Sequence, residues 1–93
     1  MEVHFHVKQN RQHLRSLISL SKKNKTSRAV KFECFNNTIK ATATNNDFIL
    51  SCILDGSIYE DGIVFLPTDV LDKAMRSSTI ILKDDRISYG EEP

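Results

Sequence analysis

The chain has no tryptophan, only two prolines, two cysteines and three glycines, and no long run of apolar residues. A membrane-spanning helix needs about 20 consecutive apolar residues, and a signal peptide needs an apolar block where this N-terminus alternates polar and apolar residues. The scattered glycines form none of the glycine-rich loops that cradle nucleotide phosphates. These absences predict a cytoplasmic protein with no membrane segment and no nucleotide cofactor.

The two cysteines are expected to form neither a disulfide nor a catalytic thiol. Cys34 and Cys52 fall in the apolar phase of predicted strands, where free cysteine behaves as a small buried hydrophobic residue. A disulfide between them is the alternative, but a reducing cytosol opposes it. Predicted burial also argues against a nucleophilic cysteine, and no serine lies in a glycine-rich elbow. We therefore predict no catalytic residues and no enzyme.

Opposite charges are separated along the chain, although the formal net charge is only +1. Residues 1–40 hold nine basic and two acidic residues, a net charge of +7, whereas residues 41–93 hold four basic and ten acidic residues, a net charge of −6. A basic segment attracts polyanions and an acidic one repels them. We therefore predict that any contacts with nucleic acid come from the first half of the chain.

Hydrophobic periodicity predicts a strand and then a helix at the start of the chain. Residues 1–8 alternate with a period of two, as in a strand with one face on a core. Asn10 is predicted to cap a helix that runs to about Lys22. The inward stripe of this helix consists of Leu14, Leu17, Ile18 and Ser21.

The period of two returns after this helix and predicts three antiparallel strands up to residue 54. The pair Asn36-Asn37 suits the two-residue turn of a hairpin. Residues 55–62 are polar and are predicted to be a linker.

A similar order of elements then follows. Residues 63–66 predict a short strand, Pro67-Thr68-Asp69 opens a second helix, and a last hairpin turns at Asp84-Asp85. Asp69 and Asp72 near the start of that helix are explained by its dipole. Residues 90–93 are predicted to be a frayed tail.

The two halves predict units of type βαβββ, about residues 1–55, and βαββ, about residues 62–90. Each unit has one apolar helix face and one apolar sheet face, so the two are expected to share one core within a single domain, residues 1–93. The predicted class is α+β, with both helices packed on antiparallel sheet.

Three segments in this order resemble the bacterial beta sliding clamp, the beta subunit of DNA polymerase III, in its N-terminal domain. They are VHFHVKQNRQHLRSLIS, IKATATNNDFILSCIL and GIVFLPTDVLDKAMRS. The resemblance implies a DNA-clamp-like fold of two βαβββ units, with no catalytic activity. The chain departs from that family because its second unit stops at Tyr89-Gly90, without a last strand, and because clamp chains carry three such domains.

The family resemblance also implies partners. Clamp helices line a central hole and face duplex DNA, so the expected partners are the phosphate backbone, further copies of this chain or other clamp domains, and a DNA polymerase or clamp loader. The expected function is sequence-independent contact with duplex DNA that supports polymerase processivity, through self-assembly. The open sheet edge left by the missing strand suggests the alternative of a clamp-like interaction module that docks on a host clamp or polymerase and regulates it.

Basic residues mark the candidate DNA-binding face. On a helical wheel Arg11, Arg15 and Lys22 fall within roughly 40° of one another, beside the apolar stripe. Small polar residues separate the cations of the following loop, a composition that suits phosphate oxygens better than base edges. The predicted DNA-binding residues are Arg11, Arg15, Lys22, Lys23, Lys25, Arg28, Lys73 and Arg76. The alternative is an ordinary solvated helix face and loop.

Three further hypotheses are weaker. A zinc triad of His4, His6 and His13 would need three converging nitrogens, and surface histidines are the simpler explanation. The acidic pairs Glu60-Asp61 and Asp84-Asp85 lie in predicted turns, where acids are common. A single-stranded nucleic acid binder stacks bases on exposed aromatics. Phe5, Phe32, Phe48 and Phe65 are predicted in the core, which leaves Phe35, Tyr59 and Tyr89.

Overall fold

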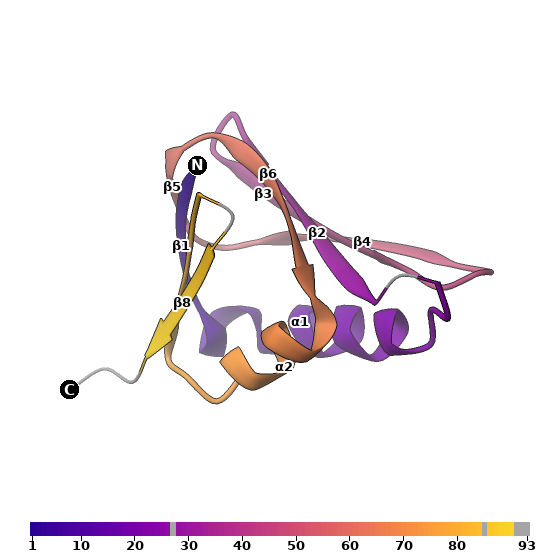
Figure 1. Cartoon of the computed structure of the whole chain (residues 1–93). Helices are drawn as coiled ribbons and strands as arrows, with labels where there is room; N and C mark the ends of the chain where they lie inside the picture. The colour runs from indigo at the N-terminus through magenta and orange to yellow at the C-terminus, as the bar shows by residue number, and fades with distance from the viewer. Residues whose placement is uncertain (27, 85, 91–93) are drawn as a thin grey trace.

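The computed structural model describes residues 1–26, 28–84 and 86–90, which fold into two helices and eight strands (Figure 1). In chain order they are β1 (Glu2–His6), α1 (Val7–Lys22), β2 (Ala29–Phe35), β3 (Thr38–Thr44), β4 (Ile49–Leu54), β5 (Ser57–Glu60), β6 (Gly62–Pro67), α2 (Thr68–Ala74), β7 (Thr79–Lys83) and β8 (Arg86–Gly90). The predicted α+β class and the order of its elements are confirmed, except that β5 is additional. Neither described helix combines the length and apolar character that a membrane crossing requires.

The described strands form two antiparallel sheets of four strands each. Sheet A has the order β5-β1-β7-β8, and sheet B has the order β4-β3-β2-β6. Each sheet mixes strands from both predicted units, since β1 pairs with β7 in sheet A and β2 pairs with β6 in sheet B. Both helices lie together on the same side of the sheets, as predicted (Figure 1).

Side chains from both sheets and both helices meet in one core. Phe5 of β1 and Phe32 of β2 are buried, and their rings stack with centroids 5.9 Å apart, which joins the two sheets. Burying one such large side chain contributes about 1.5–3 kcal/mol. The predicted inward stripe of α1 is buried throughout, namely Leu14, Leu17, Ile18 and Ser21. Of the inward residues predicted for α2, Leu71 and Ala74 are buried, and Val70 and Met75 are half-buried.

The boundary between β1 and α1 differs from the prediction. The strand ends at His6 and the helix begins at Val7, so Asn10 lies within the helix and is not its N-cap. The N–H of Val7 donates to the carbonyl of Ser78 at 2.9 Å. Strand spacing and helix spacing both turn Val7 toward the core, so periodicity could not separate the two elements at this point.

Asn10 instead joins α1 to the segment between β4 and β5. Its side chain is buried, with 1% of its surface exposed. Its Nδ2 donates to the carbonyls of His6 at 2.8 Å and Asp55 at 2.9 Å, and its Oδ1 accepts from the N–H of Asp55 at 2.8 Å. The buried amide is thus satisfied by backbone groups, which fixes the chain where it leaves sheet B.

The linker predicted for residues 55–62 contains strand β5. The chain passes from β4 at the edge of sheet B to β5 at the edge of sheet A, and β5 pairs with β1. A Cβ atom on Gly56 would lie 2.6 Å from the carbonyl oxygen of His4 and 2.8 Å from Cβ of Phe5. Because these distances are shorter than atoms can pack, glycine is required at this passage. The strand was not predicted because glycine and acidic residues, which are typical of turns, make up most of this segment.

The predicted hairpin turn at Asn36-Asn37 is confirmed. Both residues have positive φ, 53° and 60°. This left-handed region suits asparagine better than most residues, and two such residues in succession give the twist that a hairpin prefers.

The prediction that Phe65 lies in the core is wrong, because 63% of its side-chain surface is exposed. Pairing with β2 places Val64 and Leu66 of β6 on the core face, so Phe65 and Ile63 point outward. Residues 63–66 are all apolar and carry no alternation, so only the strand register could fix their phase.

The prediction for Phe48 is also wrong. Its side chain is 68% exposed, and it precedes Ile49, the first residue of β4. The Oδ1 of Asn45 accepts hydrogen bonds from the N–H groups of Asp47 and Phe48, both at 2.7 Å. This turn keeps Phe48 out of the pairing between β3 and β4, although Phe48 continues the alternation of apolar residues that marks β4 in the sequence.

The end of the chain agrees with the predicted open edge, since β8 is the outer strand of sheet A. The predicted turn at Asp84-Asp85 falls partly outside the described residues, because only Asp84 is described, with a φ of 49°. Most of the predicted tail, residues 91–93, also lies outside them.

Both cysteines are free thiols, so the disulfide alternative is excluded. Cys34 is fully buried, and burial raises the pKa of its thiol to about 11. Cys52 is half-buried in place of the predicted full burial, and burial also raises the pKa of its thiol. Cys52 lies on β4 at the edge of sheet B, where fewer neighbouring strands cover it.

We expect Asn10→Ala to lower the free energy of unfolding by about 2 kcal/mol, because it leaves the partly buried backbone N–H and carbonyl of Asp55 without their partner. Urea denaturation followed by circular dichroism measures this change. Gln12→Ala, on an exposed position of the same helix, is the control and should change stability by less than about 0.5 kcal/mol. Equal stability of the two variants would contradict the role given to Asn10.

The two thiols should differ in reactivity. At pH 8 the native protein is expected to react with a disulfide reagent through Cys52 alone, because Cys34 is buried and its pKa of about 11 keeps it protonated. Addition of denaturant should expose the second thiol. The variant Cys52→Ser should show no reactive thiol until it unfolds, and rapid reaction of that native variant would contradict the burial of Cys34.

Candidate nucleic-acid interface

Cations line the exposed side of α1. Leu14 and Ile18 face the core, which leaves Arg11 and Arg15 exposed on successive turns, because residues four apart stack along a helix. Lys22 lies two turns beyond Arg15 and is also exposed. We call Arg11, Arg15 and Lys22 the basic ridge.

A hydrogen bond between buried hydroxyls holds α2 beside α1. The Oγ of Ser21 and the Oγ1 of Thr68 are 2.7 Å apart. Ser21 donates its proton to the carbonyl of Ile18 at 3.1 Å, so Thr68 is the donor of the hydrogen bond between the helices. The N–H of Thr68 in turn donates to the carbonyl of Arg28 at 3.0 Å. The predicted helix start after Pro67 is confirmed, and the helix is locked there to α1 and its following loop.

The docked helices and the turn after α2 line an open hollow of about 400 Å³. Its charged lining consists of Arg15 and Lys22 from α1, Asp72 from α2 and Arg76 from the turn that follows α2. The remaining lining residues are Ile18, Ser19 and Met75. We call the hollow lined by these seven residues the inter-helix hollow. It brings together three of the predicted DNA-binding residues, one of them more than 50 positions from the others in sequence.

Asp72 was not foreseen as part of this surface. Its Oδ2 accepts a hydrogen bond from Nζ of Lys22 at 2.8 Å, and the two side chains are 48% and 49% exposed. At this exposure water screens the pair, which stabilises the fold by about 1 kcal/mol at most. The predicted explanation by the helix dipole holds for Asp69 in the first turn of α2 but is wrong for Asp72, which lies in the second half of this seven-residue helix. The pairing is long-range, so no local sequence signal could have shown it.

The basic loop after α1 is anchored at Asn24. Its Nδ2 donates to the carbonyl of Thr44 at 2.9 Å, and its Oδ1 accepts from the N–H of Thr26 at 2.9 Å. Asn24 is buried, whereas Lys23 and Lys25 on either side are exposed. The sequence indicates only a small polar residue between two lysines at this position. The structure ties the loop to the end of β3 and leaves its lysines in solvent.

The other predicted residues lie outside the inter-helix hollow. Lys73 is exposed on α2 but does not line the hollow, and Arg11 lies one turn before Arg15 toward the start of α1. Arg28 is exposed at the end of the basic loop. Lys40, which was not predicted to bind DNA, is exposed on the outer face of sheet B, away from the helices.

Exposed aromatic side chains occur on the outer face of sheet B. Phe35 at the end of β2 is 42% exposed, and Phe65 on β6 is more exposed still. The Nζ of Lys31 lies 5.7 Å from the centre of the Phe65 ring. The aromatic argument against a single-stranded nucleic acid binder is therefore weakened, since Phe48 and Phe65 are not in the core.

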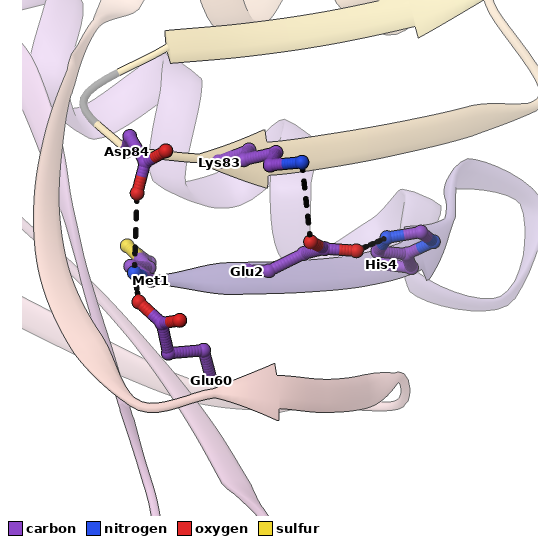
Figure 2. Close-up of polar contacts among 6 residues, drawn as sticks. All are labelled: Met1, Glu2, His4, Glu60, Lys83 and Asp84. Carbon is purple, nitrogen blue, oxygen red and sulfur yellow. Dashed lines mark hydrogen bonds and ion pairs between the residues drawn. The ribbon is translucent and has the colours of Figure 1, made fainter.

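The acidic pairs contribute carboxylates to the surroundings of Met1. Glu60 and Asp84 both contact its amino group, Asp84 at 3.5 Å (Figure 2). These contacts raise the pKa of the amino group, and the hydrogen bond to Glu60 is the largest cause. Glu60 ends strand β5 and does not lie in the predicted turn. Charge pairing accounts for both acids.

The histidines do not form a common site. The Nε2 of His4 is 2.9 Å from Oε2 of Glu2, whose other oxygen lies 3.6 Å from Nζ of Lys83 (Figure 2). The hydrogen bond with His4 lowers the pKa of Glu2. His6 is near Thr79, and His13 is on α1. Across residues 1–26, 28–84 and 86–90, no three His, Cys, Asp or Glu side chains are placed to hold a metal ion, so the zinc hypothesis has no supporting site.

Comparisons with known proteins bear on the fold. No family model matches the chain, and no curated protein matches its sequence. Among solved structures, the DNA polymerase III beta chain of Streptococcus pneumoniae TIGR4 is similar at 17% identity and a TM-score of 0.71, over 86% of this chain and 22% of that chain. The beta subunit of the DNA polymerase of Streptococcus pyogenes is similar at 20% identity and a TM-score of 0.70, over 86% of this chain and 23% of that chain.

These similarities establish a DNA-clamp-like α+β fold for the chain. They confirm the part of the sequence resemblance that concerns the fold. The chain spans less than a quarter of the length of either structure, so the activity and partners of those proteins do not transfer with the fold.

Proposed function

We propose that this chain is a non-enzymatic DNA-clamp-like domain that contacts the backbone of duplex DNA through its helix layer and supports polymerase processivity. The observation that carries the proposal is the inter-helix hollow, where Arg15 and Lys22 of α1 and Arg76 from the turn after α2 line one exposed hollow. The clamp-like fold supports it, because its two helices lie on a common side of the sheets.

The chemistry of this face suits phosphate better than bases. Arginine and lysine side chains on a helix surface attract the uniform negative charge of the duplex backbone and carry no sequence information by themselves. The lysines of the anchored loop, Lys23 and Lys25, extend the positive surface beyond the end of α1. Such diffuse attraction lets a protein move along DNA, whereas bonds to particular bases would hold it at one site.

Retention on DNA would then come from assembly. We propose that copies of this chain, or this chain with other clamp domains, surround the duplex, and that a DNA polymerase or clamp loader is the functional partner. No bond is made or broken in this mechanism. Each sheet ends in two outer strands, β5 and β8 in sheet A and β4 and β6 in sheet B, and within the described residues their outer backbone edges have no partner strand, which suits contact between neighbouring domains.

Exposed apolar side chains favour a second candidate function. Ile49 and Ile53 on the edge strand β4 are 77% and 59% exposed, and Ile63 and Phe65 project from β6 at the other edge of sheet B. Apolar side chains on an uncharged edge strand are typical of a protein-binding surface. The second candidate is therefore a clamp-like interaction module that docks on a host clamp or polymerase and regulates it.

The two candidate functions predict different binding partners, a host protein for the docking module and duplex DNA for the DNA-contacting domain. Saturable binding to a purified host clamp or polymerase that Ile53→Thr abolishes, together with no duplex binding at low salt, would favour the docking module. Binding to duplex DNA that is stronger than binding to a single strand of equal length would favour the DNA-contacting domain and oppose the single-strand alternative.

We expect Arg15→Ala to weaken duplex binding about fivefold at 0.1 M salt and to reduce the slope of log affinity against log salt by about 0.9, the loss of roughly one phosphate contact. Fluorescence anisotropy with a labelled duplex measures both. The matched control is Lys40→Ala, which removes the same charge from the outer face of sheet B. Equal effects of the two variants would contradict a DNA-binding face on the helices.

The proposed assembly should give a discrete oligomer. Light scattering after size-exclusion chromatography, over a series of protein concentrations, is expected to show one defined mass above that of the 10.6 kDa monomer. Closed rings saturate at a fixed number of subunits, unlike open chains. A strict monomer at the highest concentration, with and without duplex DNA, would exclude self-assembly.

A further inference from the structure

The ion pair between Lys22 and Asp72 lies on the face proposed to meet DNA. Asp72 lines the same inter-helix hollow as Arg15 and Arg76, and its carboxylate occupies one face of the Lys22 ammonium group at 2.8 Å. A carboxylate at this point opposes an approaching phosphate in two ways. It repels the phosphate directly, and it competes for the lysine that the phosphate would otherwise contact.

The hollow has the features of a site for one phosphate group. Two arginines can bind phosphate oxygens through their planar, forked N–H groups, and Lys22 adds a point charge. Ser19 adds a hydroxyl donor to the lining of the hollow. With Asp72 included, the charged side chains that line the hollow sum to +2, against +3 without it.

We propose that the inter-helix hollow accepts one phosphodiester group of the duplex backbone, and that Asp72 limits its affinity by competing with that phosphate for Lys22. This inference rests on the proposed function and assigns a specific residue to its control. In the free protein Lys22 is paired with Asp72. When a phosphate enters, Lys22 exchanges the carboxylate for the phosphate, and Asp72 is left to solvent.

The consequence is that the hollow binds each phosphate weakly. A hollow with two arginines and an unpaired lysine would hold a single phosphate tightly, and a domain that must move along DNA has to release each phosphate in turn. Lys22 changes one anionic partner for another, so the net gain on binding is small. Asp72 therefore sets the strength of contact without altering the fold.

The test compares Asp72→Asn with the wild-type protein. The asparagine keeps the size and an oxygen acceptor for Lys22 but removes the negative charge. We expect duplex affinity to rise roughly threefold to tenfold at 0.1 M salt, and the salt slope to steepen by up to about 0.9, because binding no longer leaves an unpaired carboxylate beside the phosphate. The probe is a labelled duplex, measured by fluorescence anisotropy over a range of salt concentrations.

The matched control is Asp69→Asn, which removes an equal charge from an exposed position of the same helix that does not line the hollow. It should change affinity much less than Asp72→Asn. A similar gain in both variants would show that only the net charge of the chain matters, and this would overturn the role of Asp72.

Lys22→Gln, made in both backgrounds, tests the competition itself. In the wild-type protein it should weaken binding only slightly, because the contact that Lys22 gains with phosphate is offset by the contact that it loses with Asp72. In the Asp72→Asn background it should remove most of the gained affinity. Additive effects of the two substitutions would contradict the competition.

The outcomes also separate this inference from the proposed function. If neither the wild type nor Asp72→Asn binds duplex DNA at low salt, both fail. If the wild type binds through Arg15 but Asp72→Asn binds no more tightly, only the role of Asp72 fails. Thermal unfolding checks that the variants are folded, and Asp72→Ser provides the same comparison if the asparagine disturbs α2.

Discussion

The hydrogen bonds between the side chain of Asn10 and the backbone of Asp55 fix the geometry on which the rest of the structure depends. At this point the chain leaves sheet B and enters sheet A, and Gly56 passes so close to β1 that no side chain fits. Since Asn10 belongs to α1, the same contact that joins the sheets also sets the position of the helix beneath them. The buried amide thus links the sheet crossover to the face that carries the basic ridge.

From this arrangement follows a positive surface on a chain that is nearly neutral overall. Seven of the nine cations of the first half lie on α1 or in the loop after it, and the docking of α2 through Thr68 brings Arg76 beside Arg15 and Lys22. Docking also brings Asp72 to Lys22, so the surface carries an internal counter-charge. The pairing of Lys22 with Asp72 arises where the two helices meet, and neither helix has it alone.

The outer faces of the sheets have a different character. Residues such as Ile53 and Phe65 leave apolar surface exposed on the edges of sheet B, opposite the helix layer. A cationic helix face and an apolar sheet edge suit different partners, the first a polyanion and the second another protein. A clamp-like domain that meets DNA on one side and neighbouring domains at its edges would use both.

The sequence by itself determined the elements that are strongly periodic: the inward stripe of α1, the alternation of β2 and β3, the turn at Asn36-Asn37 and the start of α2. These follow from local rules of spacing and backbone preference, which act over a few residues. It also located the cations of the basic ridge, because helical spacing alone puts Arg11 and Arg15 on one face. Tertiary structure decided the rest, because it depends on partners far apart in the chain. Phe65 turned outward only through pairing with β2, Asn10 became buried only through Asp55, and Lys22 met Asp72 only when the helices docked.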